Sequence, residues 1–421
     1  MFKERLGFNN SFATKTLAFE LMFMFLSYYV NVFVQNGLGI HFSVSFIFYI
    51  FAFLLSLLVY ARAFLKAKIV PFLVVLFFLL GTVIFSTTNS NSTDLIFVSF
   101  TQVVNSPALI LFFYCLPVFL LVTSEAIDYK KLHKYLVRYA LIILALFLMC
   151  YFVFRVGTES LSTTYMPFSY NAIISICLCL SYKSDSKFVS IISKIIGFVS
   201  CFVVLVAGAR GALICLICFF LLILFATKKI KPGKKALVFI CLTTVVVLGL
   251  IFYDEIIEGI GSLLEKNGVY SRTIERLANS SFLKGTDRTE LWGKVIDATT
   301  LSPLFGYGLW GDRPIVNGYC HNFFVEVICS FGFIFGGLII SIIVLSIVGY
   351  LLSKRKGGNS RYYVFLCAIP YGFIQLMFSD SYLMNVWFFF IFGIVVMNML
   401  PHRKRIFVSN ASIMERQLLN E

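Results

Sequence analysis

The sequence predicts an all-α, polytopic membrane protein with about twelve transmembrane helices and one long outer loop. Of its 421 residues, 60% are hydrophobic and only 13% are charged, whereas soluble domains are closer to half apolar and a quarter charged. The apolar residues gather in runs of about 17–25, a length that crosses a hydrocarbon core of about 30 Å. Together these observations argue against an ordinary soluble domain.

The apolar runs divide the chain into nine spans (residues 1–253), a large polar loop (254–321), and three spans with a tail (322–421). The first run is too long for a cleavable signal peptide and lacks a small-residue cleavage site, so we expect it to remain as a span. The expected spans lie at about residues 17–34, 40–60, 69–86, 107–123, 138–155, 169–182, 189–207, 211–226, 236–253, 322–351, 362–378 and 381–400.

The charge pattern orients these spans. The net charge of +15 would suggest nucleic-acid binding in a soluble chain. Here the basic residues lie mostly in short loops at membrane edges, and with both termini in the cytoplasm every inside loop is basic. Orientation therefore explains the charge, no nucleic-acid partner is expected, and loop 254–321 faces outward. Because we expect no ATP or nucleotide sugar on that side, synthetic chemistry there needs a donor that carries its own leaving group.

No metal or cofactor is expected. Most of the eleven cysteines lie in apolar runs, and no histidine joins them at metal-ligand spacing, so they are expected to be small buried hydrophobes. No D-x-D pair lies on the outer side, and the H-E-x-x-H and G-x-S-x-G motifs are missing from the chain. The run GYGLWG (306–311) matches G-x-G-x-x-G without the strand and helix of a dinucleotide fold, so it is expected to form a sharp, flexible loop.

Within the outer loop, the spacing of apolar residues predicts helices over 269–278 and 288–299. Ser302 and Pro303 mark the end of the second helix. The glycine-broken stretch 306–318 should be irregular.

The tenth span is about 30 residues long and exceeds the roughly 20 that a bilayer needs. We therefore expect it to begin above the membrane, with His321 and Asn322 at its mouth. Within this span Gly332 and Gly336 are four residues apart and would allow close helix packing.

Three polar residues on the outer side are the main candidates for chemistry: Arg210, Arg288 and His321. Arg210, flanked by glycines in VAGARGAL, is either a snorkelling residue or helix cap, or a fixed cation facing an outer cavity. Arg288 is either one half of a surface ion pair or a second anion-binding cation. Two arginines that converge would suit a pyrophosphate, because a guanidinium binds phosphate oxygens in pairs.

His321 lies where the polar loop re-enters the membrane. A lone histidine is often structural, but a neutral imidazole there would accept a proton from a sugar hydroxyl, or would orient that hydroxyl. Glu326, about one and a half helical turns further on, either helps to place the ring or forms an ion pair elsewhere. Trp310, like Tyr307, either stacks on a sugar or lies in the membrane interface. Secondary candidates for substrate contact are Arg272, Arg276, Trp292, Tyr307, Arg313 and Asn322, the three arginines being equally explicable as solvated loop charges.

The motifs follow a recognisable order: A-R-G (209–211), R-x-x-L-W (288–292), P-L-F-G-Y-G (303–308), then H-N-F-F-x-E and a glycine-rich helix (321–337). This combination resembles the O-antigen polymerase and ligase superfamily of bacterial surface polysaccharide synthesis, over about residues 200–345 by motif. The resemblance implies a metal-independent glycosyltransferase of the inner membrane, whose donor is an oligosaccharide on undecaprenyl pyrophosphate. It also implies that transfer occurs in the periplasm, that Arg210 and Arg288 neutralise the pyrophosphate, and that His321 activates the acceptor hydroxyl.

The resemblance leaves the acceptor open. We favour an O-antigen polymerase, which extends another lipid-linked repeat unit, on the H-N-F-F-x-E segment. The alternative is an O-antigen ligase, which transfers the glycan to lipid A–core. The expected partners are the lipid-linked oligosaccharide, membrane lipid and a chain-length regulator. A transporter of lipid-linked sugars would instead predict repeated halves and charged or broken helices at mid-membrane, and the sequence displays neither. A purely structural membrane scaffold would not need polar candidates gathered on one side.

Overall fold

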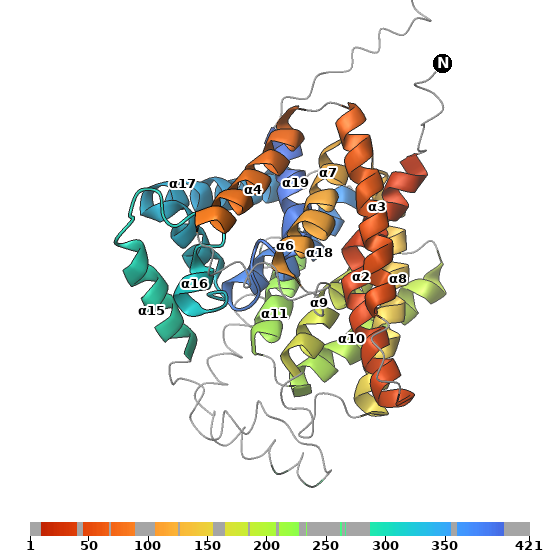
Figure 1. The fold of residues 1–421 in the computed structure, drawn as a ribbon. Helices are drawn as coiled ribbons and strands as arrows, with labels where there is room; N and C mark the ends of the chain where they lie inside the picture. Colours follow the sequence, from red (N-terminus) through yellow and green to blue (C-terminus); the bar gives the residue numbers. More distant parts are fainter. Residues whose placement is uncertain are drawn as a thin grey trace, which may run out of the picture.

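The structure is a computed structural model that describes residues 10–39, 45–66, 69–88, 106–124, 127–154, 165–183, 186–207, 210–226, 287–354 and 360–399, and the single residues 233, 262 and 266. Within these ranges every regular element is a helix (Figure 1), which confirms the predicted all-α class. The helices are α2 (Asn10–Gly37), α3 (Ser45–Lys66), α4 (Ile69–Thr88), α6 (Pro107–Ile110), η3 (Leu111–Cys115), α7 (Leu116–Ser124), α8 (Tyr129–Phe152), α9 (Tyr165–Ser181), α10 (Lys187–Ala207), α11 (Arg210–Ala226), α15 (Asp287–Thr299), α16 (Asp312–Val316), α17 (Phe323–Lys354), α18 (Ser360–Ile369), η5 (Pro370–Ile374), η6 (Gln375–Met377) and α19 (Val386–Met399).

Seven helical stretches in the described part of the chain are long and apolar enough to cross a membrane, and α9, α11 and α19 are shorter apolar helices. The chain is therefore a multi-pass membrane protein. The count of about twelve spans stays a prediction, as does the three-part division, and the expected ninth span (236–253) lies outside the described residues.

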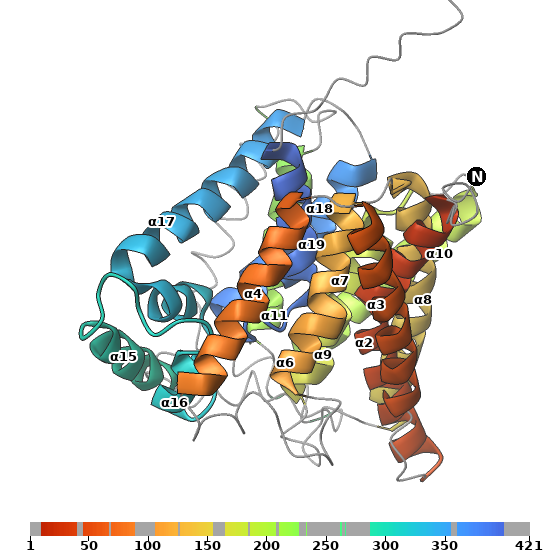
Figure 2. The same cartoon turned by 45° about the horizontal axis from the view of Figure 1, so that its top comes forward.

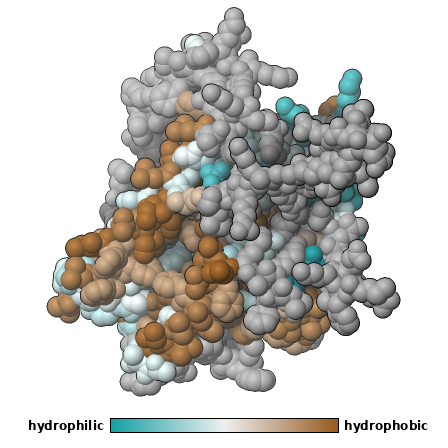
Figure 3. Space-filling model, turned by 90° about the horizontal axis from the view of Figure 1, so that it is seen from above, coloured by the Kyte–Doolittle hydropathy of each residue, from teal (hydrophilic) through white to brown (hydrophobic). Residues whose placement is uncertain are grey.

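The spans form a bundle in which α2 packs against α8, and α19 against α7. Trp387 of α19 is fully buried, and its Nε1 donates a 3.0 Å hydrogen bond to the Leu21 carbonyl of α2. The outward faces of α3 and α4 instead expose apolar side chains, such as Ile47 at 61% and Ile84 at 60%. Seen from above, hydrophobic residues cover the side of the molecule where α4 and α17 lie (Figure 3). Such an inverted surface is typical of helices that face lipid.

A proline shapes the helix that runs from α6 through η3 to α7. Pro117 has no N–H to donate to the carbonyl of Phe113, four residues earlier. The helix widens into the π turn η3 just before it. The freed backbone groups find partners on α3, because Ser56 Oγ donates to the Phe113 carbonyl and Tyr60 Oη donates to the Phe112 carbonyl at 2.5 Å. The irregular turn thus ties α3 to the bundle without leaving carbonyls unpaired.

The tenth expected span is divided at Gly332, where φ is 76° and ψ is 174°. A first arm of α17 ends at this break, and Figure 2 shows the longer second arm rising at an angle to it. From Phe333 to Lys354 the second arm is about 33 Å long at 1.5 Å per residue, enough to span a bilayer by itself. The sequence did not predict this break. Gly332 was expected to allow close packing of another helix, whereas in the structure a neighbouring loop approaches it.

That loop, residues 303–308, satisfies the backbone groups that the break releases. The N–H groups of Tyr307 and Gly308 donate to the carbonyls of Cys329 and Ser330 at 2.8 and 2.9 Å, and Phe333 N–H donates to the Pro303 carbonyl at 2.7 Å. Because a membrane offers no water to unpaired backbone groups, the loop and the broken helix stabilise each other.

The predicted helix over 288–299 is confirmed as α15, and turns follow it at Ser302 and Pro303 as expected. The stretch 306–318 is irregular except for the short helix α16, which the sequence reasoning missed. The predicted helix 269–278 lies outside the described residues. The mouth of α17 agrees with expectation, because Asn322 caps it: Asn322 Oδ1 accepts hydrogen bonds from the N–H groups of Phe324 and Val325.

Candidate functional site

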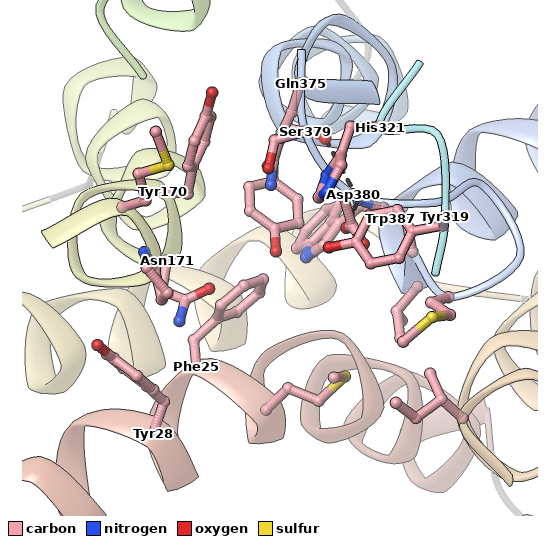
Figure 4. A pocket seen from close by; sticks show the side chains of 18 of the residues that line it. Phe25, Tyr28, Tyr170, Asn171, Tyr319, His321, Gln375, Ser379, Asp380 and Trp387 are labelled. Carbon is pink, nitrogen blue, oxygen red and sulfur yellow. Dashed lines mark hydrogen bonds between the residues drawn. The ribbon is translucent and has the colours of Figure 1, made fainter. Parts of the chain in front are cut away.

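A cavity of about 450 Å³ lies where α2, α3, α6, α9, α15, η5, η6 and the start of α19 come together with the turns that follow α16 and η6. This volume falls in the range of small-molecule sites. Figure 4 shows Phe25, Tyr28 and Asn171 on one side of the cavity. His321 and Asp380 lie on the other side (Figure 4). One wall is therefore aromatic and neutral, while the opposite wall carries ionisable groups.

Arg288 reaches the cavity from the first turn of α15. Its Nη1 donates a hydrogen bond to the Phe378 carbonyl, and its Nη2 lies 3.9 Å from Met166 Sδ. No ion pair joins Arg288 to a carboxylate among the described side chains. A backbone carbonyl orients the guanidinium without cancelling its charge, so the arginine is available to an anion.

His321 lies on the same wall, in a left-handed backbone conformation with φ of 56°. This conformation is uncommon for a residue with a Cβ. Its ring packs on Tyr319 with centroids 4.0 Å apart, and its Nδ1 is buried without a hydrogen-bond partner in the described structure. Burial, followed by the charges of Arg288 and Arg313, lowers the pKa of His321 to about 4. The imidazole is therefore neutral at neutral pH and is able to accept a hydrogen bond.

Arg313 does not line the cavity but lies in the packed interior beside it, with a side chain only 2% exposed. Its Nη2 lies 3.9 Å from Glu326 Oε1 and donates to Ser381 Oγ at 3.2 Å, and its Nη1 lies 3.8 Å from Asp312 Oδ2. The reading of Arg313 as a solvated loop charge is therefore wrong, while the ion pair expected for Glu326 is confirmed.

This buried network connects two chain segments that form the charged wall. Glu326 accepts hydrogen bonds from Ser381 Oγ and from the Tyr382 N–H, so it joins the first arm of α17 to the turn before α19. The Arg313 guanidinium also lies over the ring of Tyr319, 5.0 Å from its centroid. Since Tyr319 packs on His321, the network supports the imidazole from behind.

Asp380 completes the charged wall, and the sequence reasoning missed it. Its backbone has φ of 75°. Its carboxylate accepts hydrogen bonds from Asn385 Nδ2 at 3.0 Å and from the Ser381 N–H at 2.9 Å. Burial raises the pKa of Asp380 above its ordinary value. The available signal was that Asp380 is the single acidic residue between Arg361 and Met399 in the sequence.

Arg210 is the first residue of α11, and its side chain lies outside the described part. The backbone next to it is close to the cavity, because a Cβ on Gly211 would overlap the hydroxyl of Tyr170, a residue of the cavity wall. Arg272 and Arg276 lie outside the described residues.

The remaining described candidates do not line the cavity. Trp292 Nε1 donates to the Cys320 carbonyl at 2.7 Å, next to His321. Tyr307 Oη donates to the Ala298 carbonyl at 2.9 Å. Asn322 Nδ2 donates to the Met377 carbonyl at 3.2 Å. Among the described residues there is no group of three or more His, Cys, Asp or Glu side chains that could hold a metal ion.

The fold and this cavity define a multi-pass helical membrane protein with a charged site at one end of its bundle. Residues 195–340 match the model of the O-antigen ligase family. The chain is also similar to the ComP-specific O-oligosaccharyltransferase of Acinetobacter baylyi, with 26% identity over 219 residues, which cover 48% of this chain and 37% of that relative. The chain thus spans well under half of the relative's length. These matches confirm the resemblance to the O-antigen polymerase and ligase superfamily.

Proposed function

We propose that the chain transfers an oligosaccharide from undecaprenyl pyrophosphate to an acceptor hydroxyl inside this cavity, on the periplasmic side of the inner membrane. The observation that carries the proposal is the shared wall: an arginine without a carboxylate partner among the described side chains and a neutral histidine line one cavity. In this orientation both termini are cytoplasmic, as the basic inside loops favour.

In the reaction, the acceptor oxygen bonds to the anomeric carbon while the bond from that carbon to the pyrophosphate oxygen breaks. The carrier pyrophosphate leaves with the electron pair, so its negative charge grows. Arg288 stabilises this charge; a preorganised donor at such a position contributes on the order of 3 kcal/mol, or about 10²–10³ in rate. Arg210 is proposed as a second cation for the same group. The leaving group supplies the driving force, so the reaction needs neither ATP nor a metal.

His321 takes the proton of the acceptor hydroxyl or orients that hydroxyl. Burial and two arginines hold the pKa of His321 at about 4. A bound pyrophosphate would offset the charge of Arg288 and raise this pKa, so the imidazole becomes a better proton acceptor once the donor is bound.

The neutral wall is proposed to hold sugar. Asn171 offers both hydrogen-bond donors and an acceptor, and Phe25 and Tyr28 provide aromatic faces beside it. These groups suit an uncharged sugar ring, which presents hydroxyls along its edges and C–H groups on its faces.

Transfer to another lipid-linked repeat unit, with a chain-length regulator as partner, is the first candidate reaction. Transfer to lipid A–core or another carrier-free acceptor is the second, favoured by the family description and by the name of the relative. The two reactions share the donor and the proposed roles of Arg288 and His321. They differ in the product that remains on the carrier.

A complementation experiment tests the proposal. A strain without this gene would receive wild type, Arg288→Ala, His321→Ala or the control Lys294→Ala, which removes an exposed cation from the same helix. Surface polysaccharide and carrier-linked glycan would be resolved by size, with membrane expression checked. A polymerase is supported if the null strain shows only single-repeat surface glycan and if wild type and the control alone restore a ladder. A ligase is supported if the null strain lacks surface glycan and retains long chains on the carrier lipid. Full function from both site variants would refute the proposed site.

A further inference from the structure

Three apolar side chains in the loop that follows α15 are exposed, although this loop was expected to lie outside the membrane. Leu301 is 83% exposed, Leu304 47% and Phe305 71%. These residues, here called the apolar loop face, follow one another within five positions. Large apolar side chains that cluster in this way usually mark a surface that contacts a partner or a membrane.

The adjoining part of the loop packs against α4 well below the end of that span. Trp310 Nε1 donates a 3.0 Å hydrogen bond to Thr82 Oγ1, and a Cβ on Gly81 would overlap the side chain of Leu309. Thr82 lies six residues before the end of α4 at Thr88, which is about 9 Å along the helix axis. The loop is thus held at a depth that belongs to the span.

The loop face is also continuous with the exposed surface of α17. Phe305 stacks on Phe335 with ring centroids 5.6 Å apart. Phe335 belongs to the second arm of α17, whose neighbouring residues Ile334 and Leu338 are 62% and 56% exposed. That arm is long and apolar enough to cross the membrane, so the surface that Phe305 extends is a lipid-facing one.

We propose that the apolar loop face is embedded in the hydrocarbon of the membrane leaflet on the cavity side. The transfer of exposed apolar surface from water into hydrocarbon favours this placement. Part of the backbone cost of a loop at this depth is already met, because the Tyr307 and Gly308 N–H groups and the Pro303 carbonyl pair with the break in α17.

The placement has a consequence that rests on the proposed function. The loop directly follows α15, which carries Arg288, and precedes His321. An embedded loop therefore anchors both residues at a set height relative to the leaflet surface, where a lipid-linked pyrophosphate lies. The insertion itself does not depend on glycan transfer, so its test is independent of activity.

Tryptophan quenching by brominated lipid tests the proposal on the full chain in nanodiscs. Phe305→Trp places a probe in the loop face, and Glu290→Trp places a matched probe on α15 at a side chain that is 71% exposed. Wild type provides the background of the three native tryptophans. We expect acyl-chain bromines to quench the added emission of Phe305→Trp several-fold more than that of Glu290→Trp. Aqueous acrylamide should show the reverse order.

Two outcomes would overturn the proposal. Strong acrylamide quenching of Phe305→Trp, equal to that of Glu290→Trp, would place the loop face in water. Protection from both quenchers would mean that protein covers it, either a second copy or a partner. Because a tryptophan is similar in size and polarity to the exposed phenylalanine, folding should be retained, and thermal unfolding of each variant checks this.

Discussion

Replacing Arg313 by methionine should destabilise the folded state by about 3–5 kcal/mol, the usual cost of leaving buried charges without their partner. Arg313 Nη2 lies 3.9 Å from Glu326 Oε1, and its Nη1 lies 3.8 Å from Asp312 Oδ2, with all three side chains at most 2% exposed. At an effective dielectric constant of 20, two fully ionised groups at such a distance attract each other by about 4 kcal/mol. Without the arginine, two carboxylates remain close together in the packed interior.

The double variant Arg313→Met/Glu326→Gln should recover much of this loss, because the amide still donates and accepts hydrogen bonds but carries no charge. A double-mutant cycle, measured by unfolding in mixed micelles of increasing SDS content, should give a coupling of at least 2 kcal/mol. The exposed pair Lys294–Glu290, 2.7 Å apart, is the control and should couple by less than about 1 kcal/mol. Additive losses at Arg313 and Glu326, within about 0.5 kcal/mol, would refute the reasoning.

Three further predictions concern the site and the helix break. Arg288→Lys should keep only part of the transfer rate, because a point charge replaces a forked donor; a rate equal to wild type in vesicles supplied with lipid-linked donor would contradict this. Because the pKa of His321 is about 4 rather than the ordinary 6.5, kcat/KM should stay constant as the pH is lowered through 6.5 and should fall only near pH 4. The folded state should lose stability between pH 6.5 and 4, because in that range the unfolded chain binds a proton that the folded chain does not. A fall of kcat/KM centred at pH 6.5 would contradict the lowered pKa. Gly332→Ala should lower thermal stability markedly, because its Cβ would overlap loop carbonyls at a φ of 76°, whereas Gly337→Ala, with open space around it, should be neutral; equal unfolding temperatures would count against this account.

The buried network illustrates why sequence reasoning reached the right region but assigned one arginine wrongly. Arg288 and Arg313 lie in the same polar stretch, and the residues around them do not show which arginine is buried. Arg288 enters the cavity because the first turn of α15 faces it, whereas Arg313 is buried because α16 turns back against α17 and the turn before α19. Asp312, Glu326 and Ser381 provide its partners, and Ser381 is far away in the sequence. Long-range pairing of this kind leaves no local pattern.

The helix break at Gly332 was hidden for a related reason. A glycine in an apolar run is compatible with a continuous span, with close packing or with a break. The break is stable in a membrane because the loop 303–308 supplies hydrogen-bond partners for the backbone groups that the break releases. Asp380 likewise became visible as part of the site when η6 and the turn after it were seen to line the same cavity as α15.

The amino-acid sequence by itself determined the class of the protein, since apolar runs long enough to cross a bilayer predict membrane helices. It also indicated the polar segment, with Arg288 and His321, in which to look for the site. Those signals are local in the chain. The tertiary structure decided which polar residues meet. It joined α2, α9, α15 and the turn before α19 around one cavity, placed Arg313 behind the wall and held the loop face at membrane depth. These outcomes depend on packing between distant segments, where burial and hydrogen-bond pairing, rather than residue type, determine what each side chain does.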